Sequence, residues 1–197
     1  MRFEQARFSG EFQNLESSIV LSIDTYTKTG SKPIGKDKFG NSIWPDTSYT
    51  EVGKLLRDYK YYNVDENLNS LANILADYIT HIKELQEYTT LVSCPSSRFI
   101  NVVELAAIKL KMSSYNCLKK RKAFSMKATF KDNRSNKACL IAYNGAIPPN
   151  ERIIIVDDIV ETGATLQGCM NAIKKVQPTL DIKLLAMART LSVSCIL

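Results

Sequence analysis

The sequence of 197 residues contains a single histidine, His81, and none of its five cysteines belongs to a CxxC pair. A zinc site or a disulfide framework requires clustered cysteines or histidines, so neither is predicted. His81 lies in a helix predicted over 66–85, where a position on the helix surface is favoured over a catalytic role. The cysteines are interpreted as small, buried hydrophobic residues of a reducing cytoplasm. They are Cys94, Cys117, Cys139, Cys169 and Cys195.

The sequence also lacks a run of about eighteen apolar residues, the length that a membrane-spanning helix requires. Its first residues, MRFEQARFSGEFQ, contain no apolar segment of the kind that a secretory signal carries. We therefore expect a cytoplasmic protein with no membrane contact. Apolar residues make up 45% and charged residues 23% of the chain, which is typical of a globular protein of one domain, or one domain with an appendage.

Positive charge exceeds negative charge, and the formal net charge is +6. A basic balance favours anionic partners, such as polyphosphate substrates, nucleic acid or an anionic surface. A solvated surface without such a partner gives the same total, so charge alone leaves these alternatives open.

The segment 152–166, RIIIVDDIVETGATL, combines a buried strand with a polar turn. An uninterrupted β-branched run, here 153–156, is typical of a central parallel strand covered on both faces. The paired acids Asp157 and Asp158 follow it, and a turn with the sequence ETGAT leads into a predicted helix. Backbone N–H groups at such a helix start bind phosphate, and glycine allows close approach. Because two acids would repel a phosphate alone, we expect them to bind sugar hydroxyls or a magnesium ion of the same ligand. The alternative is an ordinary strand-turn-helix unit with a capping turn.

This pattern of four apolar residues, two acids and a Thr-Gly-x-Thr turn resembles the phosphoribosyl-diphosphate (PRPP) binding motif of the type I phosphoribosyltransferases. The resemblance implies that Asp157 and Asp158 contact the 2′- and 3′-hydroxyls of the ribose. It also implies a homodimer, and Mg2+ as the cofactor that accompanies PRPP, with the two acids as candidate ligands. The residues that would wrap the 5′-phosphate are Thr162, Gly163, Ala164 and Thr165.

Strands alternate with helices along the chain, which favours a parallel α/β sheet. Together with the resemblance, this predicts the Rossmann-like sheet of the type I phosphoribosyltransferase fold. Residues 1–86 would form an N-terminal hood of helices and a hairpin, and residues 87–197 would form the core, as one compact unit. Within the first part, 17–26 is predicted to be a strand and 27–42 a loop or hairpin tip. The S-x-x-E sequence at 48–51 predicts a capping box at a helix start.

The sequence CPSSR, residues 94–98, follows a strand predicted at 88–95 and precedes a helix predicted at 99–111. In type I phosphoribosyltransferases the loop after the first core strand binds pyrophosphate, and this segment stands where that loop should be. A plain strand-to-helix turn is the alternative. Cys94 borders the loop, where a packed thiol is favoured over a reactive one. The resemblance implies a pyrophosphate loop made of Pro95, Ser96, Ser97 and Arg98.

The basic segment 118–137, LKKRKAFSMKATFKDNRSNK, contains many basic residues and one acid, Asp132. Type I enzymes have a flexible, often hairpin-like hood at this place in the chain, which closes over the substrate and supplies a cation for pyrophosphate. One alternative is a nucleic-acid patch with stacking aromatic side chains. Another is a solvated edge strand that its lysines protect from aggregation. The resemblance implies the hood cations Lys119, Lys120, Arg121 and Lys122.

Within this family the chain is most similar to the ComF-like proteins, which act in bacterial DNA uptake. The similar segments are LLRDYKYY at the end of a helix (55–62), RFINVVELA (98–106) and MAR at the end of the last strand (187–189). The chain departs from that subgroup because it lacks N-terminal zinc-binding cysteines and a clear glutamine-rich hood. Glu161 occupies the variable position before Thr-Gly, where purine-salvage enzymes commonly have aspartate. It could act as a general base or position the acceptor base, and a solvent-facing turn residue is the alternative.

We therefore expect a protein that transfers ribose 5-phosphate from PRPP to a nitrogen acceptor and releases pyrophosphate, with Glu161 beside the acceptor. Its ligand would be PRPP or a nucleotide 5′-monophosphate. The alternative is a non-catalytic protein of ComF type that senses PRPP or nucleotides, or binds nucleic acid through the basic segment. The sequence does not identify the acceptor.

Overall fold

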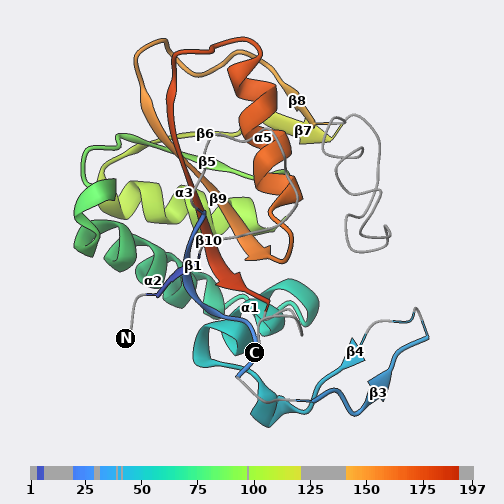
Figure 1. The fold of residues 1–197 in the computed structure, drawn as a ribbon. Helices are drawn as coiled ribbons and strands as arrows, with labels where there is room; N and C mark the ends of the chain where they lie inside the picture. Colours follow the sequence, from blue (N-terminus) through green and yellow to red (C-terminus); the bar gives the residue numbers. More distant parts are fainter. Residues whose placement is uncertain are drawn as a thin grey trace.

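The structure is a computed structural model that describes residues 4–6, 20–28, 32–38, 40, 42–96, 98–120 and 141–190. Its central element is a six-stranded sheet in the order β1-β2-β10-β9-β5-β6 (Figure 1). Strands β2, β10, β9, β5 and β6 are parallel, and β1 pairs antiparallel with β2. The predicted parallel α/β architecture is therefore confirmed. The strands are β1 (Glu4–Ala6), β2 (Val20–Thr25), β5 (Thr90–Ser93), β6 (Ser113–Tyr115), β9 (Arg152–Val160) and β10 (Asp181–Arg189).

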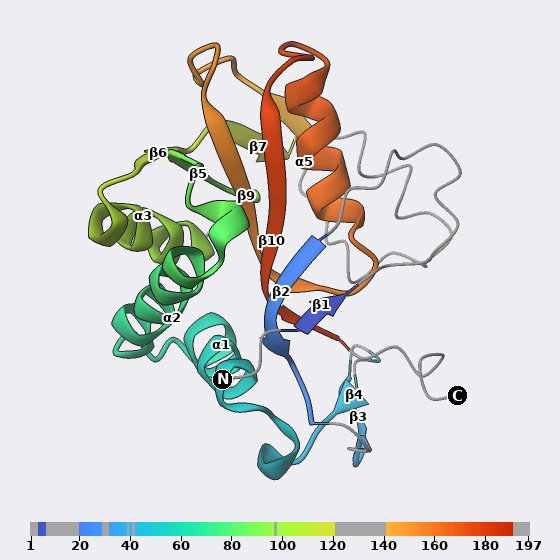
Figure 2. The same cartoon turned by 60° about the vertical axis from the view of Figure 1, so that its left-hand side comes forward.

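Helices cover both faces of this sheet (Figure 2). On one face lie α1 (Glu51–Tyr61), α2 (Asn67–His81) and α3 (Phe99–Leu110), and on the other face lies α5 (Ala164–Lys174). Each face has its own cluster of buried apolar side chains. The sheet is therefore buried between two layers of helices, as parallel strands require.

The apolar run of β9 alternates between the two clusters. Ile153 and Ile155 pack in the cluster that includes α5, whereas Ile154 and Val156 pack in the cluster that includes α1, α2 and α3. Because both faces are covered, a continuous apolar run forms this strand, as the sequence predicts. The strand continues beyond that run to Val160, so the two acids lie within it.

The first helix begins differently from the predicted capping box. Its N-cap is Thr50, whose Oγ1 accepts a hydrogen bond from the Gly53 N–H at 3.0 Å. Ser48 lies instead in a preceding 3-10 turn (Asp46–Ser48). The Thr50 hydroxyl also donates to the carbonyl oxygen of Thr25 at 2.5 Å. The predicted cap at Ser48 is wrong because this contact with the end of β2, which joins residues far apart in the sequence, favours Thr50.

The second helix is shorter than the sequence predicts. α2 ends at His81, and a 3-10 turn (Lys83–Leu85) follows it. His81 is exposed, and its ring Nδ1 lies 2.6 Å from the carbonyl oxygen of Asp77. The predicted surface position of the histidine is therefore confirmed.

The N-terminal region supplies one strand of the central sheet, because β2 pairs in parallel with β10. At the end of the segment predicted as a loop or hairpin tip (27–42), β3 and β4 form a small antiparallel hairpin, which extends away from the sheet (Figure 1). A domain boundary at residue 86 stays a prediction. Among the described residues, no helix has the length and apolar character needed to cross a membrane. The hairpin strands are β3 (Gly35–Lys36) and β4 (Ser42–Ile43).

The basic segment begins in a second small sheet, in which β7 (Leu118–Lys120) pairs antiparallel with β8 (Ile141–Tyr143). Lys119 and Lys120 are exposed on β7. The rest of the segment, including Arg121 and Lys122, lies outside the described residues.

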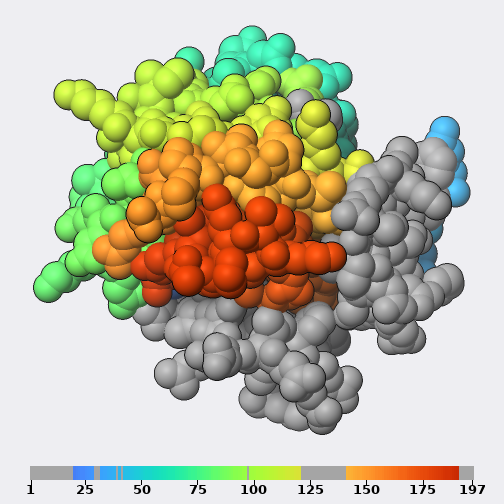
Figure 3. Space-filling view, turned by 90° about the horizontal axis from the view of Figure 1, so that it is seen from above, coloured from blue at the N-terminus to red at the C-terminus, as the bar shows by residue number. Residues whose placement is uncertain are grey.

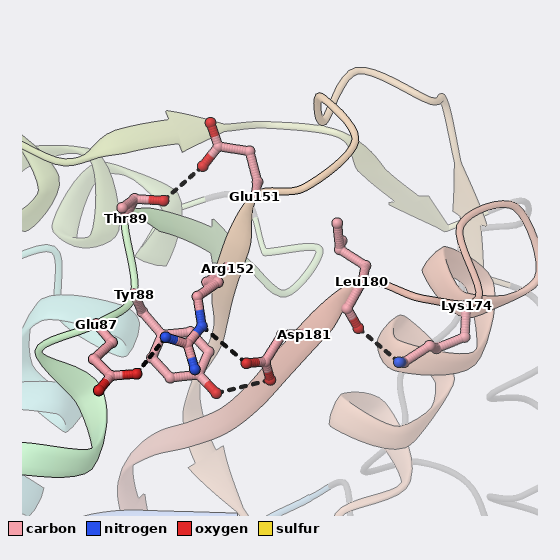
Figure 4. A network of polar contacts seen from close by, with 8 residues as sticks. All are labelled: Glu87, Tyr88, Thr89, Glu151, Arg152, Lys174, Leu180 and Asp181. Atoms are coloured by element: carbon pink, nitrogen blue, oxygen red, sulfur yellow. Dashed lines mark hydrogen bonds and ion pairs between the residues drawn. The ribbon is translucent and has the colours of Figure 1, made fainter.

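A polar network holds the edge at which β9 and β10 begin (Figure 4). Arg152 forms an ion pair with Glu87 and donates from Nε to Oδ2 of Asp181 at 2.9 Å. The Tyr88 hydroxyl donates to Oδ1 of Asp181 at 2.8 Å, and the Arg152 guanidinium lies 5.1 Å from the centre of the Tyr88 ring. Figure 3 shows this edge from above. The orange and red segments that lead into β9 and β10 cover it. The network ties the start of β9 to the start of β10 and to the segment before β5.

Replacing Tyr88 by phenylalanine should lower the free energy of unfolding by about 1 kcal/mol, because the ring stays buried while its hydrogen bond to Asp181 is lost. Urea titration of both proteins measures this difference. The same change at Tyr62, which is 66% exposed, should have no measurable effect. Equal stabilities for the Tyr88 variant and the unmodified protein would show that the network does not stabilise this edge.

Candidate functional site

The two acids of β9 lie at the carboxyl end of the central strand, opposite the polar network. Ligands bind at this edge in open α/β sheets. Asp157 is 9% exposed and Asp158 is 5% exposed, so both carboxylates are buried. Asp157 Oδ1 accepts a hydrogen bond from the Asp158 N–H at 3.0 Å, and Asp158 Oδ1 accepts one from the Ile159 N–H at 2.7 Å. The local backbone thus fixes one oxygen of each acid.

Asp158 forms an ion pair with Lys60, which lies in the last turn of α1. Figure 1 shows α1 below the carboxyl ends of β9 and β10. The Nζ atom of Lys60 donates to Oδ2 of Asp158, so both oxygens of this carboxylate have a donor. Lys60 is the residue beside the acids that the sequence prediction missed. Its segment, LLRDYKYY, resembles the ComF-like helix ending, and this was the available signal.

The electrostatics of the pair are those of two acids that share a buried site. Burial, and then the charge of Asp158, raises the pKa of Asp157 to about 7. The positive charges of Lys60 and Lys120 oppose this rise. Burial alone would lower the pKa of Lys60, but attraction to Asp158 and smaller contributions from Tyr61 and Asp157 together outweigh it, so the pKa of this ammonium group is raised. Cations of α1 and β7 therefore both act on the acid pair.

The turn after β9 leads directly from these acids to the start of α5. Gly163, the N-cap of α5, has a φ of 75°, in the left-handed region that favours glycine. A Cβ atom there would meet no atom within 4 Å, so the backbone conformation, and not lack of space, requires glycine. The Thr162 hydroxyl accepts from the Ala164 N–H at 3.4 Å, a long hydrogen bond. The start of α5 thus presents N–H groups and hydroxyls of the kind that bind an anion.

Thr165 lies in the first turn of α5, and Glu161 is exposed directly after β9. The two acids predicted to contact the ribose and the residues predicted to contact the 5′-phosphate therefore lie on one short segment, 157–165. Their roles as ligand contacts stay predictions.

The predicted pyrophosphate loop follows β5, the neighbour of β9. The Cys94 N–H donates to the carbonyl oxygen of Val156 at 2.9 Å, which places the start of the loop beside the acids. The Ser96 hydroxyl accepts from the Phe99 N–H at 3.4 Å, at the start of α3. Pro95 is partly buried, and Ser97 lies outside the described residues.

Arg98 has its partners at the end of α1 and in the loop after it. Its guanidinium lies 4.7 Å from the centre of the Tyr59 ring, donates to Oδ1 of Asn63 at 2.7 Å and forms an ion pair with Asp65. The Tyr59 hydroxyl donates to the carbonyl oxygen of Arg98 at 3.2 Å. In this structure Arg98 therefore joins α3 to the end of α1 and the loop after it, and its predicted contact with pyrophosphate stays a prediction.

The thiol of Cys94 lies 3.5 Å from that of Cys169 in α5, and both are buried. Burial raises the pKa of the Cys94 thiol well above its ordinary value. Because the thiolate is the reactive form, this favours the predicted packed thiol over a reactive one.

The donor set does not fit a metal ion held by the protein alone. Among the described residues, no three acids, cysteines or histidines gather in one place. Asp158 is already neutralised by Lys60. The surroundings of the two acids therefore do not favour direct coordination of Mg2+ by their carboxylates.

A family model described as "Phosphoribosyl transferase domain" matches residues 64–192, about two thirds of the chain. The parallel sheet with its flanking helices and this match confirm the predicted type I phosphoribosyltransferase fold. The particular similarity to ComF-like proteins stays a prediction. No curated protein matches the sequence.

Several solved structures resemble this chain. Adenine phosphoribosyl transferase from Trypanosoma brucei, in complex with AMP, pyrophosphate and ribose-5-phosphate, is 12% identical with a TM-score of 0.47, over 81% of this chain and 77% of that one. A Helicobacter pylori xanthine-guanine-hypoxanthine phosphoribosyltransferase is 13% identical with a TM-score of 0.46, over 68% and 87%. Leishmania donovani UMP synthase is 13% identical with a TM-score of 0.45 over 79% of this chain, which spans 27% of that longer one.

Proposed function

Because this chain belongs to the phosphoribosyltransferase family, we propose that it binds PRPP at the carboxyl edge of its sheet and transfers ribose 5-phosphate to a nitrogen acceptor. The observation that carries this proposal is the buried acid pair of β9, joined by a short turn to the start of α5. A fold alone does not define a function. This arrangement, however, combines carboxylates suited to sugar hydroxyls with a helix start suited to phosphate.

The two acids would hold the ribose unequally. Both oxygens of Asp158 already accept hydrogen bonds, from Lys60 and from the Ile159 N–H. Asp157 Oδ2 has no donor among the described residues, so it is the oxygen best placed to accept a ribose hydroxyl. The 5′-phosphate would accept hydrogen bonds from the turn that begins at Thr162.

In the proposed reaction the bond between C1′ and the pyrophosphate oxygen breaks, and a bond between C1′ and the acceptor nitrogen forms. Negative charge develops on the departing pyrophosphate, which the ammonium groups of Lys119 and Lys120 and the hydroxyl of Ser96 would stabilise. The acceptor nitrogen loses a proton in the same transfer. Glu161, exposed after β9, would take this proton or position the acceptor.

The test is release of pyrophosphate when the protein is incubated with PRPP, magnesium and a panel of nitrogen bases. We expect release with at least one base, and a loss of about tenfold or more in Thr162→Ala, since a hydrogen bond to the charged phosphate contributes about 1.5 to 3 kcal/mol. Thr179→Ala is the matched control, because Thr179 is exposed before β10 at the opposite edge. PRPP that binds without any pyrophosphate release would contradict catalysis with those bases.

The second candidate function is non-catalytic binding of nucleic acid, which the exposed lysines of β7 favour. DNA or RNA affinity should then fall steeply with salt and weaken when Lys119 and Lys120 are both replaced by glutamine. An unchanged affinity in that variant would argue against this surface as the binding site.

A further inference from the structure

We infer that Lys60 is a built-in counter-ion for the acid pair. Its ammonium group takes the position on Asp158 that a divalent cation would otherwise occupy. The site therefore binds ribose 5-phosphate without a metal ion on these carboxylates. This inference rests on the proposed function, because it concerns how the proposed ligand is held. It assigns Lys60 a positioning role, since the ammonium group acts through Asp158.

The contacts of Asp158 leave little room for a metal ion. One carboxylate oxygen accepts from Lys60 Nζ and the other from the Ile159 N–H. A magnesium ion is usually bound in proteins through one or two carboxylates, and at Oδ2 of Asp158 it would have to displace the ammonium group. No third acid, cysteine or histidine among the described residues completes a cluster with the pair. The surroundings therefore fit a fixed ammonium group better than a metal ion.

Lys60 is held in place by its helix, which is anchored at both ends. At the start of α1, the Thr50 hydroxyl donates to the Thr25 carbonyl oxygen at 2.5 Å. Near its end, the Tyr59 hydroxyl donates to the carbonyl oxygen of Arg98, whose guanidinium stacks on the Tyr59 ring. The Lys60 side chain is only 29% exposed, and the Asp158 side chain is 6% exposed. This lysine is therefore fixed by the fold and is no mobile surface cation.

The charge balance favours the same conclusion. When both acids are ionised they carry two negative charges, and Lys60 reduces the net charge of the group to −1. Because the lysine belongs to the chain, this neutralisation needs no ion from solution and no entropy loss of a free cation. Asp158 is thereby held in a fixed orientation, and Asp157 Oδ2 remains to accept a ribose hydroxyl.

The first experiment uses the ligand-free protein and measures thermal unfolding with MgCl2 or with EDTA. Magnesium should not shift the midpoint for the unmodified protein, for Lys60→Arg or for the control Lys54→Met on the exposed face of α1. It should raise the midpoint of Lys60→Met, because the acid pair then lacks its counter-ion and takes up the divalent ion. Equal shifts in all four proteins would overturn the inference, whatever the ligand proves to be.

The second experiment measures the affinity for ribose 5-phosphate by calorimetry, again with MgCl2 or with EDTA. The unmodified protein and Lys60→Arg should bind equally well in both. Lys60→Met should bind about tenfold more weakly in EDTA, and magnesium should restore most of the loss. A loss of the same size with and without magnesium would indicate a merely structural role and overturn the inference.

These outcomes separate the inference from the proposed function. If the unmodified protein binds ribose 5-phosphate only with magnesium, the counter-ion role is wrong and the proposed function stands. If it binds ribose 5-phosphate in neither buffer, the proposed function is wrong, and the unfolding experiment still decides whether Lys60 excludes a divalent ion from the acids.

Discussion

Replacing Gly53 by alanine is expected to lower the free energy of unfolding by about 3 kcal/mol. A Cβ atom at Gly53 would lie 1.9 Å from the carbonyl oxygen of Tyr26 and 2.8 Å from its carbonyl carbon. These are backbone atoms of the residue directly after β2, so a side-chain rotation does not relieve the clash. The change should also move α1 away from the acids and weaken ribose 5-phosphate binding.

Chemical denaturation measures the stability change, and Gly35→Ala is the matched control. Gly35 lies in β3 with no atom within 4 Å of its added Cβ, so that variant should unfold like the unmodified protein. If Gly53→Ala were as stable as Gly35→Ala, the close contact between α1 and β2 described above would be incorrect.

Replacing Asp157 by asparagine is expected to change the free energy of unfolding in a way that depends on pH. The free energy of unfolding of the variant minus that of the unmodified protein should be about 2 kcal/mol larger at pH 8 than at pH 5. Burial and the charge of Asp158 raise the pKa of Asp157 to about 7 in the folded protein, above its ordinary value of 3.8. Between these values the folded state binds more protons than the unfolded state. The contribution of Asp157 to stability is therefore present at low pH and is lost as the pH rises through about 7.

Asparagine is neutral at every pH and retains an oxygen for the Asp158 N–H, so it removes the cost of ionising a second buried acid. Thermal unfolding of both proteins between pH 5 and pH 8 measures the effect. Asp77→Asn, an exposed change on α2, should show no such trend. A stability difference that does not grow with pH would mean that Asp157 is ionised throughout this range.

The fold could be predicted from the sequence where a local pattern of apolar residues decides the structure. The β-branched run before the acids is typical of a strand covered on both sides, and β9 is that strand. The turn at Gly163 could also be predicted from the sequence, because the residue types that permit such a turn are few and occur together there.

The ion pair between Lys60 and Asp158 was not readable, because it joins residues 98 positions apart through the packing of α1 against the sheet. The surroundings of Arg98 were not readable either. Its basic side chain beside a helix start suggests an anion, but the folded chain places Asp65 and the ring of Tyr59 next to it. A local pattern gives the chemistry of a side chain, and tertiary packing selects its partner.

The same limit applies to the start of α1. The S-x-x-E pattern at 48–51 is a valid local signal for a helix cap, and Thr50 is an equally good capping residue. The hydrogen bond from the Thr50 hydroxyl to Thr25 decides between them, and this contact forms only when β2 lies beside the helix.

The central claim is that the acid pair and the turn before α5 form a site for the ribose 5-phosphate group of PRPP. Calorimetric titration of PRPP onto the unmodified protein and onto Asp157→Asn at pH 8 tests it most directly. We expect one binding event per chain for the unmodified protein, and an affinity at least about tenfold weaker for the variant, which remains folded. Absence of binding to the unmodified protein, or equal binding to both, would contradict the claim.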